Sequence, residues 1–483
     1  MTSTPPKART LGELKRAGYR PLSIRDEMRK NLIAALEART PLFPQMVGYE
    51  ESVIPQLENA ILAGHDMIFL GERGQGKTRI IRSLIVLLDE FIPIVKGSEV
   101  ADDPFDPISR MARQALADKG DGMEIDWLHR SRRYGEKLAT PDTTTAELIG
   151  DIDPIKVAEG RYLSDETTIH FGLIPRSNRG IFAINELPDL AEKVQVGLFN
   201  ILEERDVQIK GYTIRMPLDI VVVATANPED YTSRGRIITP LKDRYSAHIR
   251  THYPLEREHE VRIIDQEYGR FDRHGRTLIV PPFIKDIVAE ITFQARHSPD
   301  VNQVSGVSVR MSINNMESLI SNAEKRAIRN AEMEIVPRIS DLVAITATTD
   351  GKLELEYGGQ ERTQAQIIGK LIQKAVLVVF NERLPLDQLE LLLASFQEGW
   401  WAEISDSLPS SHYLSTLATV RGMKQGVEKL RVGESPGEIA SAIELILEGL
   451  HVNNKLNKDV VDGKAIYNEA HKVQPVGRNQ DMA

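Results

Sequence analysis

The sequence has 483 residues, which is longer than one average domain and predicts two to four domains. Hydrophobic residues make up 41% of the chain, enough for a sizeable core, and the formal charge of −10 argues against a strongly electrostatic binder of nucleic acid or membrane surfaces. The absence of cysteine excludes disulfides, thiolate zinc sites and thiol catalysis.

The N-terminal region predicts an arm followed by helices and one strand. Residues 1–24 are polar and contain prolines, so we expect a loosely held arm; they lack the apolar segment of a signal peptide. Apolar residues recur at helical spacing over 25–39, and a second helix is expected over 50–62. The apolar run 67–70 predicts a buried parallel strand. No apolar run is long enough to span a bilayer, so we expect a cytoplasmic protein without membrane contact.

The middle of the chain alternates between apolar runs and helical patterns. Residues 98–140 are charged and irregular, and we expect inserted helices and loops there. The runs 180–184 and 220–225 predict buried strands, with a helix over 190–204 between them. Residues 207–216 alternate like a small hairpin. Strands separated by helices predict an α/β fold, a parallel sheet with helices on both faces.

From residue 256 onward the pattern is mainly helical. The exception is 342–357, where Asp350 and Gly351 separate two alternating segments; this dipeptide favours a type I′ turn and predicts a hairpin. A further helix is expected to begin at Ser435 as N-cap, with Pro436 in its first position. The last dozen residues are expected to be disordered.

The segment that follows the first strand matches the P-loop pattern completely. Its residues are Gly71, Glu72, Arg73, Gly74, Gln75, Gly76, Lys77 and Thr78. The glycines allow a tight loop whose amide hydrogens converge on phosphates, and the following helix adds its positive N-terminal dipole. Lys77 would supply a charge to the β- and γ-phosphates, and the Thr78 hydroxyl would ligate Mg²⁺. These residues predict binding of ATP with Mg²⁺.

A second acidic element is expected at the end of another strand. The apolar run 84–88 ends at Asp89 and Glu90, but it belongs to the helix that begins at the P-loop and would hold its carboxylates far from the phosphates. The better candidate is the strand that ends at Asn185 and Glu186. Asn185 replaces the usual aspartate; its carbonyl oxygen accepts a hydrogen bond from a magnesium-bound water but brings no charge. Glu186 would orient or activate the attacking water, with a helix-capping carboxylate as the alternative.

With these motifs placed, the chain resembles the AAA+ ATPases of the magnesium-chelatase I-subunit group, which is related to the MoxR-type ATPases. The resemblance covers roughly residues 40–340 and rests on the P-loop and on residues 46–50, 172–180, 226–229 and 241–245, in this order along the chain. It implies a P-loop AAA+ core followed by a mainly helical lid. We therefore divide the chain into an N-terminal arm and helix (1–40), the ATPase core (41–255), the helical lid (256–345), and a C-terminal hairpin and helical extension with a disordered tail (346–483).

The resemblance assigns further roles to individual residues. Asn227 matches the polar sensor that positions the attacking water. Arg244 matches the arginine finger, which reaches the nucleotide of the neighbouring subunit, although Arg234 and Arg236 lie close in sequence and could share or take over that role. Arg310 matches the second sensor, a nucleotide-binding residue at the start of a lid helix. The 207–216 hairpin matches one that often faces a central pore.

The resemblance also implies an assembly. A finger that acts in trans implies a homo-oligomeric ring, commonly a hexamer, and relatives often act with a partner that carries a von Willebrand A-type domain. We expect ATP hydrolysis in such a ring to remodel or activate a protein partner. Two alternatives stay open: a true magnesium-chelatase subunit that drives metal insertion into a porphyrin, and a slow nucleotide-gated scaffold, prompted by Asn185.

Two other classes of function are disfavoured. The acidic composition and the absence of a recognisable DNA module argue against a motor that acts on nucleic acid. A bacterial enhancer-type transcription activator would need a Gly-Ala-Phe-Thr-Gly-Ala loop between the P-loop and Glu186, and the sequence has none.

Some residues outside these motifs permit two interpretations. Trp400 and Trp401 predict a packed helical core, with a docking patch for a partner as the alternative. The arginines at 130, 132 and 133 predict a solvated or inter-subunit face. Arg176 and Arg179 would either face a neighbouring nucleotide or form salt bridges with the sheet.

Overall fold

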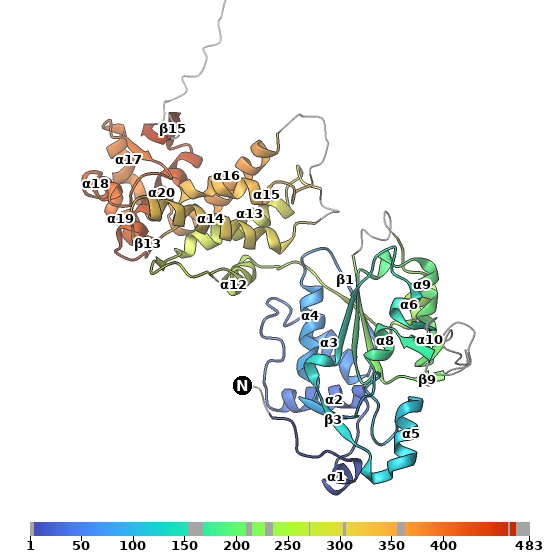
Figure 1. Cartoon of the computed structure of the whole chain (residues 1–483). Coiled ribbons are helices and arrows are strands. Elements are labelled where there is room, and N and C mark those ends of the chain that lie inside the picture. Colours follow the sequence, from blue (N-terminus) through green and yellow to red (C-terminus); the bar gives the residue numbers. More distant parts are fainter. Residues whose placement is uncertain are drawn as a thin grey trace, which may run out of the picture. The chain divides into compact units, whose positions relative to one another are not determined.

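The structure is a computed structural model that describes residues 4–152, 168–208, 215–227, 235–269, 271–302, 306–354, 363–461 and 464–469. It contains two compact units, which Figure 1 shows: unit 1 is Met1–His252 and unit 2 is Tyr253–Ala483. Among the described residues, no helix is both long enough and apolar enough to cross a membrane.

Unit 1 is built on a five-stranded parallel sheet. The strand order is β11-β1-β10-β7-β4, with bounds β1 (Met67–Leu70), β4 (Tyr134–Leu138), β7 (Gly180–Asn185), β10 (Ile220–Ala226) and β11 (Ala247–Arg250). The register sets Leu70 beside Ala226 and Leu138 beside Asn185. The carboxyl ends of these strands therefore lie along one edge of the sheet, where ligands bind in folds of this type.

Helices cover both faces of this sheet, as Figure 1 shows. Along β7, Ile181 and Ala183 pack into one core while Phe182 and Ile184 pack into the other, which explains why the strand reads as a continuous apolar run. One face carries α2 (Ile24–Glu37), α3 (Val53–Leu62), α4 (Lys77–Ser83) and the short helix η1 (Leu84–Leu87). The other carries α8 (Leu173–Arg176), α9 (Glu192–Gly197), α10 (Phe199–Glu203) and α11 (Thr239–Arg244). The predicted α/β class is confirmed.

The N-terminal segment is packed rather than loose, so the expectation of a loosely held arm is wrong for the residues described before 24. A short helix, α1 (Leu11–Arg16), buries Leu11 and Leu14, and the Trp127 indole donates to the Ala8 carbonyl oxygen at 2.9 Å. These residues pack against the insert that follows α4. The insert contains β2 (Phe91–Val95), paired antiparallel with β3 (Ile125–His129), and α5 (Arg110–Lys119).

A small hairpin follows the two short helices α9 and α10, as expected from the alternation over 207–216. Its described residues form β8 (Asp206–Gln208) and β9 (Arg215–Pro217), which pair antiparallel. The residues between them lie outside the described chain. The predicted helix over 190–204 is present as α9 and α10, which are separated at Leu198.

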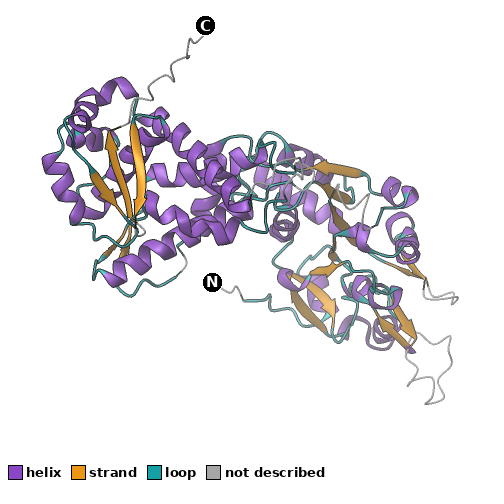
Figure 2. Cartoon of the chain, turned by 90° about the horizontal axis from the view of Figure 1, so that it is seen from above, coloured by secondary structure: helices purple, strands orange, loops and turns teal. Residues whose placement is uncertain are grey.

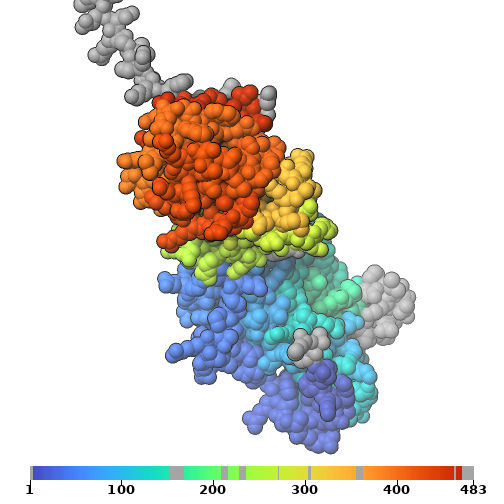
Figure 3. Space-filling model, turned by 90° about the vertical axis from the view of Figure 1, so that its left-hand side faces the viewer, coloured from blue at the N-terminus to red at the C-terminus, as the bar shows by residue number. Residues whose placement is uncertain are grey.

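Unit 2 is mainly helical, and Figure 2 shows helices around a small antiparallel sheet. The longer helices are α12 (Arg257–Glu267), α13 (Pro282–Arg296), α14 (Val309–Arg329), α16 (Gln364–Arg383) and α20 (Pro436–Val452); shorter ones are α17 (Glu390–Gln397), α18 (His412–Thr419) and α19 (Met423–Lys429). The sheet has the order β14 (Ala402–Ile404), β16 (Lys464–Glu469), β15 (Leu456–Val461). One core extends from Ile264 to Tyr467, so the predicted lid and C-terminal extension share it. In Figure 3 the orange-to-red residues form one continuous mass.

The hairpin predicted over 342–357 is absent from its described residues, which end at 354. They instead form a 3₁₀ helix, η7 (Ile339–Ile345), and the short helix α15 (Thr346–Thr349). Leu342, Ile345 and Thr349 are buried at helical spacing. Gly351, with φ +70°, follows the helix end, so the Asp-Gly pair terminates a helix rather than turning a hairpin. The C-terminal hairpin of the chain is β15–β16; the expected disordered tail lies outside the described residues.

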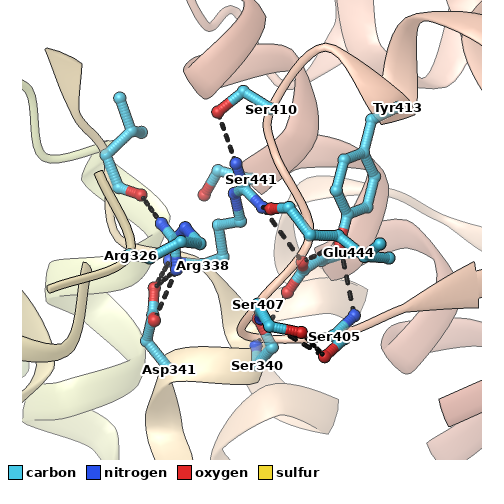
Figure 4. A network of polar contacts seen from close by, with 12 residues as sticks. Arg326, Arg338, Ser340, Asp341, Ser405, Ser407, Ser410, Tyr413, Ser441 and Glu444 are labelled. Carbon is cyan, nitrogen blue, oxygen red and sulfur yellow. Dashed lines mark hydrogen bonds and ion pairs between the residues drawn. The ribbon is translucent and has the colours of Figure 1, made fainter. Parts of the chain in front are cut away.

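A buried polar network joins η7 to three helices of unit 2 (Figure 4). Arg326 of α14 pairs with Asp341 at 2.5 Å, and Tyr413 of α18 donates to the Glu444 carboxylate of α20 at 2.5 Å. The Ser340 amide donates to the same carboxylate at 2.7 Å. Burial raises the pKa of Glu444. Buried charges need such partners, so the network fixes how η7 lies on the helices.

The tandem tryptophans are not part of this core. Trp400 is 40% exposed and Trp401 is 59% exposed, so the prediction of a packed helical core at this pair is wrong. They follow the end of α17 and precede β14, and the turn between these elements holds both rings at the surface.

Candidate nucleotide site

The P-loop connects β1 to α4 at the carboxyl edge of the sheet. Gly74 and Gly76 have φ values of +76° and +77°, which glycine adopts without steric cost. A Cβ added to Gly71 would lie 2.1 Å from the Thr251 hydroxyl and 2.2 Å from the Gln75 side-chain oxygen, so a larger residue would have to displace these two side chains. The loop therefore has the glycine-dependent conformation that turns backbone amides toward a phosphate, and these residues fit ATP.

Lys77 connects this loop to the end of a neighbouring strand. The side chain is buried, and its ammonium donates to the Gly71 carbonyl oxygen and, at 2.8 Å, to that of Glu72. It also donates to the Asn227 amide oxygen at 2.5 Å. The Asn227 amide nitrogen in turn donates to the Glu186 carboxylate at 2.6 Å. Three residues predicted from separate motifs thus form one continuous chain of contacts.

Glu186 stands in a special backbone conformation directly after β7. Its φ is +56°, in the left-handed region, and its amide donates to the Thr225 hydroxyl at 2.9 Å. The carboxylate accepts from Asn227 instead of capping the short helix η5 (Leu187–Asp189) that follows, so the capping alternative is wrong. Thr225 is fully buried in β10 and was not predicted; only the register between β10 and β7 could have indicated it.

Asn185, the residue that replaces the usual aspartate, contacts a carboxylate on the next strand. Its amide nitrogen donates to Glu136 of β4 at 2.6 Å, and its oxygen lies 3.5 Å from the Thr225 hydroxyl. The Arg82 guanidinium of α4 donates to both oxygens of Glu136 at 2.8 Å and lowers the pKa of that carboxyl. Sequence reasoning missed Glu136 because β4 was not predicted as a strand.

The oxygen atoms of this site suit Mg²⁺. Within the described ranges, no three His, Asp or Glu side chains are arranged to hold a metal by themselves. Mg²⁺ does not require such a group, since it is commonly held by one or two protein oxygens together with waters and substrate phosphates. Thr78 and Asn185 are the predicted ligands, and their oxygen donors fit the ion. Asp89, in contrast, pairs with Lys30 at 2.9 Å on the α2 side, as expected for the rejected candidate.

Arg244, the predicted finger, contacts residues of its own chain in this structure. It ends α11 and pairs with Glu203 of α10 at 2.5 Å, donates to the Pro240 carbonyl oxygen at 2.7 Å and lies over the Phe199 ring at 4.4 Å. Arg236 is largely exposed and lies 3.6 Å from Glu192. Arg234 lies outside the described residues, so the choice among the three arginines stays a prediction.

The predicted second sensor, Arg310, is exposed, whereas Arg133 and Arg179 are buried in ion pairs. Arg310 lies at the start of a helix, α14, as predicted, and its side chain is exposed; Ser308 caps this helix. The nucleotide role of Arg310 stays a prediction. Arg133 is buried and pairs with Glu27 at 2.6 Å, so the expectation of a solvated or inter-subunit face is wrong for this residue. Arg179 is buried and lies 3.4 Å from Asp103, which makes it a structural ion pair.

Several known proteins have sequences similar to this chain. The family described as Sigma-54 interaction domain matches residues 157–244. Magnesium-chelatase subunit ChlI of Nostoc sp. (strain PCC 7120) is 29% identical over 249 residues, which cover 50% of this chain and 63% of the relative. The chloroplastic ChlI of Glycine max is 28% identical over 263 residues, which cover 50% of this chain and 56% of the relative. The match thus spans less than two thirds of each relative.

A solved structure of the complex between the BchI and BchD subunits of magnesium chelatase is also similar to this chain. It is 18% identical, the match covers 68% of this chain and 98% of that one, and the TM-score is 0.34. A TM-score this low carries no argument about the family. The comparison with a family therefore depends on the sequence relatives and on the nucleotide site itself. By these matches the chain is similar to AAA+ ATPases of the magnesium-chelatase I-subunit group, the group that its motifs indicate.

Proposed function

We propose that this chain binds ATP with Mg²⁺ and hydrolyses it, and that a ring of such chains uses hydrolysis to remodel or activate a protein partner. The observation that carries the proposal is the chain of contacts from Lys77 through Asn227 to Glu186. It connects a phosphate-binding ammonium to a carboxylate through one amide. Through this connection, the binding of a phosphate at Lys77 can change the orientation of Glu186, the carboxylate proposed to activate water.

Each residue has a distinct role in this proposal. Lys77 and the P-loop amides would hold the phosphates, and Thr78 and Asn185 would hold Mg²⁺, which neutralises phosphate charge when bound. Glu186 would orient and activate the attacking water. Asn227 would keep the Glu186 carboxylate turned toward that water. Arg244 would stabilise the transition-state charge at the nucleotide of a neighbouring subunit, and Arg310 would contact the nucleotide from unit 2.

Steady-state ATP hydrolysis by the purified full-length chain tests the proposal. Glu186→Gln removes the carboxylate but keeps a side chain that Asn227 can contact, and we expect kcat to fall by about 10²–10⁴-fold while ATP still binds. Lys77→Ala should abolish binding as well as turnover. Turnover in the wild type no higher than in Glu186→Gln would contradict the motor function and favour the slow scaffold.

The chain offers a matched control for these substitutions. Asp89 follows an apolar run much as Glu186 does, but it contacts Lys30 and Asn31 of α2 instead of the P-loop residues. Asp89→Asn should therefore leave turnover within about twofold of the wild type, because exposed substitutions away from a site have small effects. If Asp89→Asn reduced turnover as strongly as Glu186→Gln, the assignment of the water-activating carboxylate would be wrong.

The partner can be identified with the same variant. A Glu186→Gln chain that binds ATP without hydrolysing it should retain its partner, and isolation of the trapped complex with mass spectrometry would reveal it. We propose a partner with a von Willebrand A-type domain and a homo-hexameric ring, both from the family resemblance. Recovery of a porphyrin-binding subunit would instead favour the narrower function, metal insertion into a porphyrin by a magnesium chelatase, the enzyme that the relatives are named after.

A further inference from the structure

We propose that Glu136 supplies, at the magnesium side of the site, the negative charge that Asn185 lacks, and that it positions Asn185 toward the metal. The proposal extends the ATP site described above and rests on the proposed function for its nucleotide and metal. It assigns to β4, an edge strand of the sheet that the sequence did not predict, an indirect part in metal binding, through Asn185 and through the charge of Glu136.

The first argument is the contact between the two side chains. Glu136 is paired in register with Ala183, two residues before Asn185, so it lies on the same face of the sheet as Asn185. The carboxylate accepts from the Asn185 amide nitrogen at 2.6 Å. This contact turns the amide oxygen of Asn185 away from Glu136. An aspartate at position 185 could not donate this hydrogen bond, so the asparagine and the glutamate form a matched pair.

The second argument is the location of Glu136 beside the P-loop helix. Arg82 of α4 donates to both of its carboxylate oxygens, and Arg82 lies four residues after Thr78, on the same side of the helix. One turn of helix rises about 5.4 Å, and helical side chains point back toward the N-terminus. The contact between Arg82 and Glu136 therefore brings a carboxylate close to the turn that carries the Thr78 hydroxyl, where Mg²⁺ is predicted.

The third argument concerns the hydrogen bonds that fix the carboxylate. Glu136 accepts from Arg82, from the Tyr134 hydroxyl at 3.0 Å and from Asn185. Its side chain is 21% exposed, so the charge is only partly screened by solvent. These bonds hold the carboxylate in one orientation. Glu136 is therefore a positioning residue, which acts on the metal through its charge and through Asn185.

A simpler interpretation is that Glu136 and Arg82 form only a salt bridge that ties β4 to α4. The two interpretations differ in the effect of removing each partner. A salt bridge that is only structural loses the same contact whichever partner is replaced. If Glu136 supplies charge to the metal, Glu136→Gln should weaken Mg²⁺ binding, whereas Arg82→Gln should leave it unchanged or strengthen it, because Arg82 opposes the metal charge.

The experiment measures the binding of ATP by the full-length chain as Mg²⁺ is titrated, with a second measurement in EDTA. For Glu136→Gln we expect the Mg²⁺ concentration at half-saturation to rise about 10-fold or more, since residues that orient metal ligands are commonly worth 10–100-fold in metal affinity. Affinity for ATP in EDTA should not change. A thermal unfolding curve for each variant shows that the chain is folded.

Exchange of the carboxylate and the amide between positions 136 and 185 gives a second test that does not depend on Arg82. Asn185→Asp alone would place two carboxylates in contact, and we expect no gain in Mg²⁺ affinity. The double variant Asn185→Asp with Glu136→Gln moves the negative charge to position 185 and should restore the wild-type Mg²⁺ dependence. The proposal is overturned if Glu136→Gln leaves that dependence unchanged, if Arg82→Gln weakens it equally, or if Asn185→Asp alone strengthens it.

These results can be separated from those that test hydrolysis. The readout is the Mg²⁺-dependent binding of ATP. A wild-type chain that binds ATP but does not hydrolyse it contradicts the motor function, and the Mg²⁺ titration still tests the role of Glu136. A wild-type chain that hydrolyses ATP, with a Glu136→Gln variant of unchanged Mg²⁺ dependence, contradicts only the role of Glu136.

Discussion

Thr225 keeps Glu186 in its unusual backbone conformation. The left-handed φ of Glu186 is uncommon for a residue with a Cβ, and such conformations persist only where the surrounding structure holds them. Here the holding contact is the hydrogen bond from the Glu186 amide to the buried Thr225 hydroxyl. The same hydroxyl lies next to the Asn185 amide oxygen, so one side chain orders both residues at the end of β7.

Thr225→Val should therefore separate positioning from binding. Valine has nearly the same shape but leaves the partly buried Glu186 amide without its acceptor, which costs about 1 kcal/mol. We expect the free energy of unfolding to fall by that amount, kcat to fall at least 10-fold, and the affinity for ATP to stay the same. Chemical denaturation, steady-state kinetics and ATP binding measure the three quantities; unchanged kcat would show that Glu186 does not need this bond. Thr225→Ser, which retains the hydroxyl, serves as the matched control.

The site residues that lie in sequence motifs could be predicted from the sequence. The site residues that strand pairing brings next to β7 could not. Lys77, Asn227 and Glu186 each follow an apolar run, and the carboxyl ends of parallel strands meet at one edge. Thr225 and Glu136 belong to the site only because β10 and β4 both pair with β7. Nothing in a single sequence specifies that register, and β4 lacks the apolar run that would mark it as a strand.

Among the elements, α2 shows how the N-terminal region becomes part of the core. Glu27 of α2 makes a bidentate pair with Arg133, with both bonds at 2.6 Å, and both side chains are buried. Arg133 directly precedes β4 and also donates to the Arg179 carbonyl oxygen at 2.8 Å. Glu27 further accepts from the Asp89 amide. One carboxylate thus connects α2 to the segments that precede β2, β4 and β7.

Glu27→Ala should destabilise the chain strongly. It would leave the Arg133 guanidinium buried without its counter-charge, which typically costs about 3–5 kcal/mol. The matched control is Glu37→Ala in the last turn of the same helix, where the side chain is exposed and the expected change is within about 0.5 kcal/mol. Denaturant unfolding of the full-length variants measures both. Equal, small effects would show that α2 is not held by this ion pair.

The elements also show why some patterns are misleading. Residues 342–354 alternate in a way that fits a strand, yet Leu342, Ile345 and Thr349 fit a helical face equally well. Local sequence does not choose between the two, and the buried pairing of Asp341 with Arg326 of α14 provides a tertiary contact for the helical form. At Ser435 the N-cap and the following proline agree with the helical pattern, and α20 begins as predicted.

At the scale of the whole molecule, the location of Arg244 bears on whether a single chain contains a complete catalytic site. Arg244 is held by Glu203, Pro240 and Phe199 of its own subunit, whereas Lys77 contacts the P-loop and Asn227. We infer that Arg244 leaves Glu203 to act on a neighbouring nucleotide. Its surface pair with Glu203 is only partly buried, and such pairs are worth little, so the exchange is energetically modest.

Mixing two inactive variants tests this arrangement. Arg244→Ala chains keep an intact P-loop but lack the finger, and Lys77→Ala chains keep the finger but do not bind ATP. If the finger acts in trans, a mixed ring contains interfaces at which an intact P-loop meets an intact Arg244, and turnover should return to a fraction of the wild-type rate that depends on the mixing ratio. Arg244→Ala alone should be reduced about 10³–10⁵-fold if Arg244 acts as fingers do in other P-loop enzymes, and Lys77→Ala alone should show no turnover because it does not bind ATP. A mixture with no more activity than its components would show that Arg244 acts within its own subunit or not at all. In that case the mixing experiment is repeated with Arg236→Ala in place of Arg244→Ala. Recovery of turnover in this second mixture would show that Arg236 acts as the finger.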